Sequence, residues 1–132
     1  METLNNLEVI KYNVLTLEQK EEFKTIKSLP NCIYLVCSYN KLTRLPKLPK
    51  CELLDCSNNR LVHLPELPKC EILDCPNNLL VDLPELPECE VFDCSNNQLT
   101  ELPKLPKCEL LHCSNNQFVH LPELPKCEIF NC

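Results

Sequence analysis

Glycine is entirely absent from this chain of 132 residues, and long apolar runs are missing as well. Without glycine, the chain cannot form the Gly-rich loops that cradle phosphate groups in nucleotide-binding sites. We therefore expect asparagine at any turn position with a left-handed backbone conformation, which it tolerates next best after glycine. No stretch approaches the roughly 18 apolar residues that a membrane-spanning helix needs. These absences argue against a phosphate-binding loop and against a transmembrane span.

Basic charge is also scarce, since 13 Lys and Arg residues face 19 Asp and Glu residues for a formal net charge of -6. No basic stripe is present, so we expect neither nucleic acid nor a membrane surface as the main partner, and a basic protein is accommodated more easily. The N-terminal residues lack the charged segment and apolar run of a signal peptide. We therefore expect a cytoplasmic protein, in which cysteines stay as thiols.

Cysteine, in contrast, is abundant, and its spacing indicates a repeat. The twelve cysteines form two series in which every step is 19 residues. The first series is Cys32, Cys51, Cys70, Cys89, Cys108 and Cys127, and the second is Cys37, Cys56, Cys75, Cys94, Cys113 and Cys132. A fixed period near 20 is typical of a solenoid, whose units stack to bury a continuous core. We predict an N-terminal cap over residues 1–31 and a solenoid over residues 32–132, with five 19-residue repeats and a partial sixth.

Each repeat, numbered from its first cysteine as position 1, divides into a strand, a turn and a return. Position 4 is always large and apolar and shares one face with the cysteine at position 6, which predicts one short strand per repeat. Asparagine recurs at position 9, where its amide can satisfy backbone groups in a turn. These residues are Asn40, Asn59, Asn78, Asn97 and Asn116. The Leu-Pro-x-Leu-Pro segment that follows, as in residues 64–68, excludes a regular helix and favours an extended, polyproline-like return.

The combined pattern Cys-x-x-Leu-x-Cys-x-x-Asn-x-Leu resembles the leucine-rich-repeat signature, with cysteine at the first and third leucine positions. The Leu-Pro-x-Leu-Pro return is similar to the short LPX subtype of bacterial effectors, such as the Shigella invasion-plasmid and Yersinia outer-protein families. The cysteine-substituted form also resembles leucine-rich-repeat proteins of amoeba-infecting giant viruses (mimivirus type). The resemblance implies a mostly β, right-handed repeat solenoid, with a parallel sheet on its concave face and extended returns on its convex face. For a viral protein, the expected location becomes the host-cell cytoplasm.

The cap is expected to contain one short helix. Thr16 and Gln19 resemble a capping box, which predicts a helix over residues 17–27. Residues 7–15 are apolar enough for either a strand or a second helical piece. We expect the cap to cover the open end of the first repeat.

The two cysteine series should form ladders inside the core, because parallel strands stack equivalent residues. In-register side chains hold their β carbons wider apart than a disulfide prefers, so we predict no intrachain disulfides. The simplest interpretation is that cysteine serves as a slim core hydrophobe. A thiol store or soft-metal site is the alternative, and burial disfavours it because a buried sulfur stays a thiol. Cys132 is the expected exception to inertness, and we predict no metal and no cofactor.

Side chains that point away from the core form a candidate binding surface. Position 3 gives an apolar stripe, framed by glutamates at position 2 and by acids at position 5. Such a stripe usually marks a contact surface, although strand propensity alone also favours these residues. The predicted partner-binding residues are Tyr34, Leu53, Asp55, Ile72, Asp74, Val91, Asp93, Leu110, His112 and Ile129. We hypothesise a non-enzymatic protein–protein interaction module that binds its partner through the concave strand face.

The sequence offers no convincing catalytic arrangement. His63 and His120 occupy the same repeat position three repeats apart, roughly 14 Å along the stack, so they cannot share one metal ion. His112 adjoins Cys113, yet adjacent side chains of a strand point to opposite faces. The ubiquitin-ligase domain that often accompanies these repeats in bacterial effectors has no counterpart in this sequence. We predict that the chain is not an enzyme.

The sixth repeat stops after its strand, which leaves an apolar cross-section and an unpaired strand edge. The alternative function is therefore that of a self-associating structural protein, an oligomer such as a homodimer, assembled through Cys127, Ile129, Phe130 and Cys132. A fragment of a longer array would expose the same surface.

Overall fold

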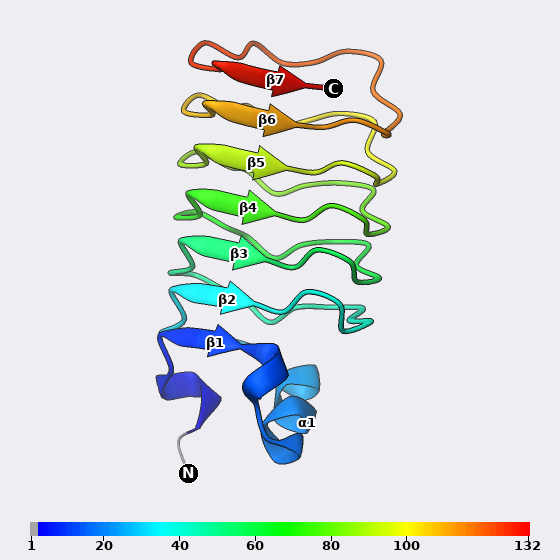
Figure 1. The fold of residues 1–132 in the computed structure, drawn as a ribbon. Helices are drawn as coiled ribbons and strands as arrows, with labels where there is room; N and C mark the ends of the chain where they lie inside the picture. The colour runs from blue at the N-terminus through cyan, green and yellow to red at the C-terminus, as the bar shows by residue number, and fades with distance from the viewer. Residues whose placement is uncertain (1–2) are drawn as a thin grey trace.

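The computed structural model describes residues 3–132 and confirms a repeat solenoid built on one parallel sheet (Figure 1). Seven strands follow one another across the sheet in chain order. They are β1 (Val9–Lys11), β2 (Tyr34–Val36), β3 (Leu53–Asp55), β4 (Ile72–Asp74), β5 (Val91–Asp93), β6 (Leu110–His112) and β7 (Ile129–Asn131). The helical pieces are the 3-10 turns η1 (Leu4–Asn6) and η2 (Tyr12–Val14) and the helix α1 (Leu17–Thr25). Within the described residues, no helix has the length and apolar character needed to cross a membrane.

Strand pairing keeps the same register along the sheet, so equivalent repeat positions lie side by side. Ile72, for example, pairs with Val91 of the next coil. Before each strand, the carbonyl at position 2 accepts two backbone N–H groups from the next coil. The Glu52 carbonyl accepts from Glu71 N at 2.8 Å and from Ile72 N at 3.1 Å. Each coil therefore offers its neighbour the same donors and acceptors, which is the physical basis of the fixed period.

In the turns after β3 to β6, two consecutive asparagines have different roles. At position 8, Asn77 has a φ angle of 58°, in the left-handed region, and Asn58, Asn96 and Asn115 match it. At position 9, Asn78 Nδ2 donates to the carbonyls of Cys75 at 3.2 Å and of Cys56 in the preceding coil at 3.0 Å. Its Oδ1 accepts from Leu61 N at 3.0 Å. The prediction that asparagine replaces glycine in the turn, and that position 9 satisfies backbone groups, is confirmed for these coils.

The first repeat departs from this rule. Tyr39 occupies position 8 and has a φ angle of 61°, and Lys41 has one of 55°. The expectation that asparagine takes the left-handed conformation is wrong here, because the sequence places Asn40 only at position 9. The backbone bond from Tyr39 N to the Ser57 carbonyl, 3.1 Å long, holds this turn in the shape of the next coil. That contact offsets the roughly 1–2 kcal/mol that a left-handed residue with a β carbon costs.

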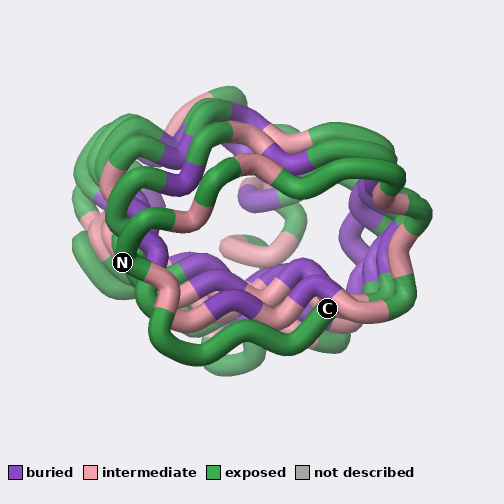
Figure 2. Tube along the Cα trace, turned by 90° about the horizontal axis from the view of Figure 1, so that it is seen from above, coloured by how far each residue is buried: buried purple, intermediate pink, exposed green. Residues whose placement is uncertain are grey.

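Both cysteine columns lie in the core, as expected. Figure 2, a view from above, shows buried residues recurring at the same places of successive coils. At position 1, the thiol of Cys70 donates to the carbonyl of Ile72 at 3.3 Å, so its polar hydrogen is satisfied inside the core. At position 6, Cys75 is fully buried, and return leucines such as Leu67 and Leu86 pack into the same core. Cys127 and Cys132 are the less buried exceptions.

The N-terminal segment closes one end of the solenoid. Residues 7–15 contain β1, which pairs with β2, followed by the helical turn η2, so this segment forms both of the elements that the sequence left open. The capping box is confirmed, since Gln19 N donates to Thr16 Oγ1 at 3.1 Å and Thr16 N donates to Gln19 Oε1 at 3.0 Å. The ring of Phe23 in α1 is fully buried and packs edge-to-face on Tyr12, with the ring centroids 5.1 Å apart.

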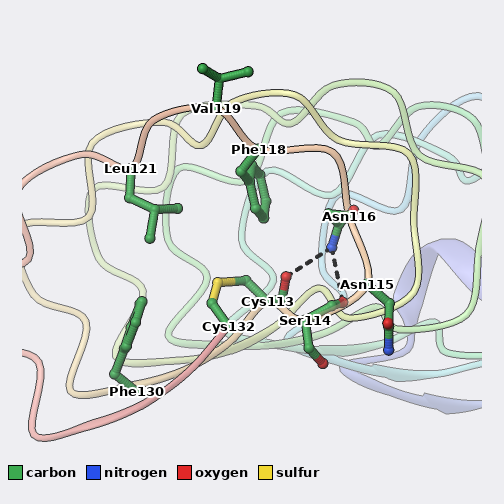
Figure 3. A pocket seen from close by; sticks show the side chains of 9 residues that line it. All are labelled: Cys113, Ser114, Asn115, Asn116, Phe118, Val119, Leu121, Phe130 and Cys132. Carbon is green, nitrogen blue, oxygen red and sulfur yellow. Dashed lines mark hydrogen bonds between the residues drawn. A yellow bond between two sulfur atoms is a disulfide. The ribbon is translucent and has the colours of Figure 1, made fainter.

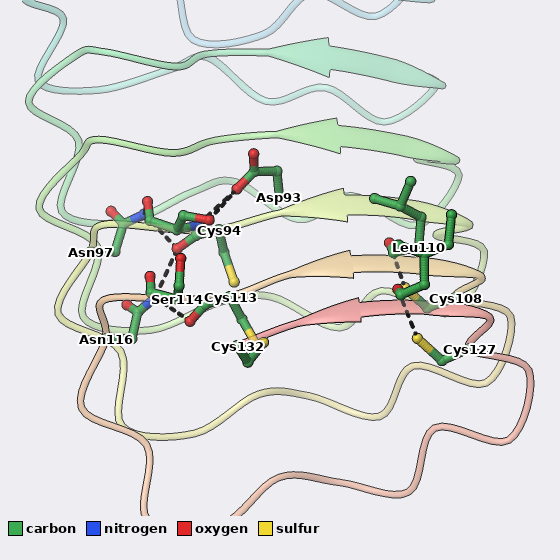
Figure 4. Close-up of a disulfide and its surroundings, with 12 residues drawn as sticks. Asp93, Cys94, Asn97, Cys108, Leu110, Cys113, Ser114, Asn116, Cys127 and Cys132 are labelled. Carbon is green, nitrogen blue, oxygen red and sulfur yellow. Dashed lines mark hydrogen bonds between the residues drawn. A yellow bond between two sulfur atoms is a disulfide. The ribbon is translucent and has the colours of Figure 1, made fainter.

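One disulfide corrects the prediction that the chain forms none. Cys113 and Cys132 are joined, with their Cα atoms 4.5 Å apart, a separation that a disulfide can span (Figure 4). The argument from in-register side chains holds where both cysteines are packed between coils. Cys132 is exposed and follows the edge strand β7, so its side chain is free to turn toward Cys113. The other ten cysteines are free.

Candidate functional site

The outer surface of the sheet, here called the strand face, is formed by the side chains at positions 3 and 5. In each of β2 to β6 the residue between them is buried, so positions 3 and 5 point together toward solvent. Tyr34, Ile72 and Ile129 are 46%, 39% and 55% exposed, although all three are large and apolar. Leu53, Val91, Leu110 and the position 5 residues of β3 to β6 are half-buried. The structure thus brings all ten predicted partner-binding residues onto one surface.

Three aspartates stack at position 5 of this face, in the order Asp55, Asp74, Asp93. The outer two each accept two hydrogen bonds from the serine two residues later; for Asp55 these come from Ser57 N and Oγ, at 3.1 and 2.7 Å. The corresponding residue of the middle coil is Pro76, which has neither an N–H nor a hydroxyl group. Burial, together with the charges of Asp55 and Asp93, raises the pKa of Asp74 from its ordinary value of 3.8 to about 6.

Acidic side chains continue along the edge of the strand face. The position 2 residues Glu71, Glu90, Glu109 and Glu128 are exposed. The nearby lysines of position 19 do not pair with them in the described part of the chain; Lys107 instead pairs with Glu88 of the preceding coil. Within residues 3–132 these carboxylates form no ion pair. The apolar stripe lies between this row and the aspartates at position 5, so the strand face is suited to a cationic partner.

The remaining candidate groups lie apart from one another. His63 pairs with Asp82 of the next coil through Nδ1 at 2.8 Å, and both side chains are exposed. Within residues 3–132, no three His, Cys, Asp or Glu side chains are grouped so that they could hold a metal ion. Burial raises the pKa of the Cys51 thiol to about 11 and that of Cys32 to about 12. These thiols stay protonated at neutral pH and are poor nucleophiles and poor ligands.

The C-terminal end carries a second surface, which the sequence predicted only in part. Phe130 is half-exposed, whereas Leu111, the equivalent residue of the preceding coil, is fully buried. Phe130 and Cys132 border a hollow of about 350 Å³ whose other walls include Phe118, Val119 and Leu121 (Figure 3). These last three residues were missed by sequence reasoning. The signal available in the sequence was their place on the return of the last complete repeat. Residues 3–132 contain no further return that could pack against them.

Comparisons with known proteins agree with this architecture. No family model and no curated protein matches the sequence. Among solved structures, the chain is similar to YopM, a leucine-rich effector protein from Yersinia pestis, with a TM-score of 0.74 and 36% sequence identity. The similarity covers 90% of this chain, which spans 34% of that structure's length. The 19-residue coils, the parallel sheet and this similarity together establish that the chain has the leucine-rich-repeat fold.

Proposed function

We propose that the chain is a non-enzymatic protein-binding module that holds its partner against the strand face. The observation that carries the proposal is the run of apolar side chains at position 3, which are exposed or half-buried on an otherwise polar surface; Tyr34, Ile72 and Ile129 are the exposed ones. An exposed apolar stripe costs solubility, and surfaces of this kind are usually covered by a partner. The partner binding sites of a repeat protein extend over several coils, which matches a stripe that runs from Tyr34 to Ile129.

The chemistry of the strand face indicates what kind of partner fits. The stripe would accept apolar side chains, while the rows at positions 2 and 5 would attract lysine or arginine on either side. The net charge of -6 would add long-range attraction for a basic protein. We therefore infer a basic protein partner that presents an extended segment in which apolar and cationic residues alternate. The cytoplasm, and for a viral protein that of the host cell, is the proposed place of this interaction.

A peptide selection tests this function even while the partner is unidentified. A random peptide library is selected on the immobilised chain, and the dissociation constants of the enriched peptides are measured. We expect sequences that combine lysine or arginine with aliphatic residues, and an affinity that falls as the salt concentration rises. Replacing both Ile72→Asp and Leu110→Asp should weaken binding about tenfold or more, because the stripe is lost at two coils.

The matched control replaces Val62→Asp and Val81→Asp. Both valines are also exposed, yet they belong to position 12 on the returns, outside the strand face. This variant should bind the selected peptides within about twofold of the unchanged chain. Equal weakening by both variants, or peptides that show no preference for cationic residues, would contradict the proposal. Thermal unfolding of each variant distinguishes lost binding from lost structure.

A further inference from the structure

The C-terminal end of the solenoid exposes side chains more fully than interior coils expose their equivalents. Val119 is 80% exposed, compared with 43% for Val81 at the same position of an interior coil. Phe130 is 49% exposed, and its equivalent in β5, Phe92, is fully buried. We call Phe118, Val119, Leu121 and Phe130 the end face; they surround the hollow shown in Figure 3. The hollow lies where the turn and return of a next coil would pack.

Backbone groups at the end face are also left without the partners that interior coils provide. β7 is the last strand of the sheet, so its outer edge is unpaired among the described residues. In interior coils, the N–H at position 11 donates to an asparagine Oδ1 of the next coil, as Leu99 N does to Asn116 at 3.0 Å. Phe118 occupies position 11 of the last complete repeat, and residues 3–132 supply no such amide to it. An occupant must therefore offer both apolar contacts and a strand edge.

The opposite end of the solenoid is closed and cannot serve as that occupant. Leu4 of η1 and Phe23 of α1 are fully buried there, and both segments lie beyond β1 (Figure 1). A head-to-tail stack would also continue the parallel register, which places Glu128, next to β7, against Glu8, next to β1. Steric cover and like charge both oppose such a stack.

We propose that the end face binds a second copy of the chain across a two-fold axis, with the two β7 strands paired antiparallel. This inference is independent of the function proposed for the strand face. In the register that pairs all three residues of β7, Phe130 faces Phe130 of the second copy and Ile129 faces Asn131. Glu128 then lies opposite Cys132, so the two glutamates are kept apart. Because each copy has one such end, the assembly closes at two copies.

The first test is the mass of the full chain by sedimentation or light scattering over a wide range of concentrations. We expect a reversible monomer–dimer equilibrium, with no larger species. Val119→Lys should raise the dimer dissociation constant about tenfold or more, since it places a charge in the apolar contact. Val81→Lys makes the same change inside the stack and should leave the constant nearly unchanged. A denaturing gel without reductant excludes copies linked by a disulfide through Cys127.

The second test addresses the antiparallel pairing. Ile129→Lys alone should weaken the dimer, and adding Asn131→Glu should restore it, because the two-fold axis places these positions opposite each other. A parallel arrangement would set each residue beside its own kind, and the double variant would then gain nothing over the single one. A chain that stays monomeric at every concentration overturns the proposal, as does a dimer that Val119→Lys and Val81→Lys weaken equally. Growth into long polymers would overturn the closed two-fold arrangement.

Discussion

At the scale of single residues, Asp74 shows how one substitution in a regular array changes the chemistry of a site. Its neighbours in the stack, Asp55 and Asp93, each have a serine two residues later that donates to the carboxylate. Asp74 has Pro76 there and has two carboxylates beside it. Burial of the carboxyl, together with the charges of these two neighbours, raises the pKa of Asp74 to about 6. In the middle of the acidic row, burial and neighbouring charge thus disfavour the ionised carboxylate.

We predict that Asp74→Asn stabilises the fold at neutral pH. The pKa of Asp74 is about 6 when folded and 3.8 as an ordinary carboxyl, so the folded state binds the proton more tightly. The stability that this proton provides is complete below about pH 4 and is lost as the pH rises through about 6. The Asn variant should therefore gain about 1 kcal/mol above pH 6.5, a figure that allows for solvent screening of a half-exposed group.

Urea unfolding at several pH values measures this difference. The gain should shrink to near zero at pH 4, where the carboxyl of the unchanged chain is protonated in both states. Glu85→Gln removes the same charge from an exposed position on a return and should give no comparable pH-dependent gain. A stabilisation of Asp74→Asn that is equal at pH 4 and pH 7.5 would contradict the electrostatic explanation.

At the scale of elements, the turn after each of β3 to β6 depends on two asparagines, one for the backbone conformation and one for hydrogen bonds. Asn77 supplies the left-handed backbone conformation, whereas Asn78 is buried and links two successive coils. Asn78→Ala should cost about 3 kcal/mol, because Leu61 N loses its buried acceptor and the carbonyls of Cys56 and Cys75 each lose one of their two asparagine donors. Asn77→Gly, in the same turn, should change stability by less than about 1 kcal/mol, since glycine adopts a positive φ readily. Denaturant unfolding of the two variants provides the comparison; equal costs would show that the turn does not divide its tasks in this way.

The elements also show how far sequence reasoning can go. The strands, the position 9 asparagines and the buried cysteine columns were predictable, because each is specified five or six times at one spacing. The cap was harder, since β1 is a single three-residue strand whose apolar residues suit a helix equally well, and pairing with β2 decides the matter. The left-handed Tyr39 and the disulfide of Cys132 were not predicted. Both occur at the ends of the array, where tertiary contacts override the repeat pattern.

For the strand face, the sequence predicted which side chains point outward but not the raised pKa of Asp74. Alternation along each strand was enough to identify the outward residues, such as Ile72 and Asp74. The raised pKa of Asp74 could not be read from alternation, because it depends on partial burial and on the charges of Asp55 and Asp93. The walls of the end face, such as Val119, were missed because in an interior coil the next return covers part of the equivalent residue; Val81 is 43% exposed, compared with 80% for Val119.

At the scale of the whole molecule, the cysteines should react according to their place in the stack. Nine of the free cysteines are buried, and Cys127 alone among the described free thiols is partly exposed. We expect one fast-reacting thiol in the folded, unreduced chain at pH 8, ten after unfolding and twelve after unfolding with reductant. A thiol reagent with a coloured product measures all three. Cys127→Ser should abolish the fast phase, and several fast thiols in the folded state would show that the core is more open than the structure indicates.

The identical register between successive coils has a consequence for how such a molecule can change its length. Asp74 meets Asp93 as Asp55 meets Asp74, and each turn asparagine reaches back to the same carbonyl of the coil before it. A gene duplication or deletion that adds or removes one whole unit would therefore leave every remaining junction intact. Misaligned recombination between near-identical units could then lengthen or shorten the strand face in single steps, while the cap and the end face stay as they are.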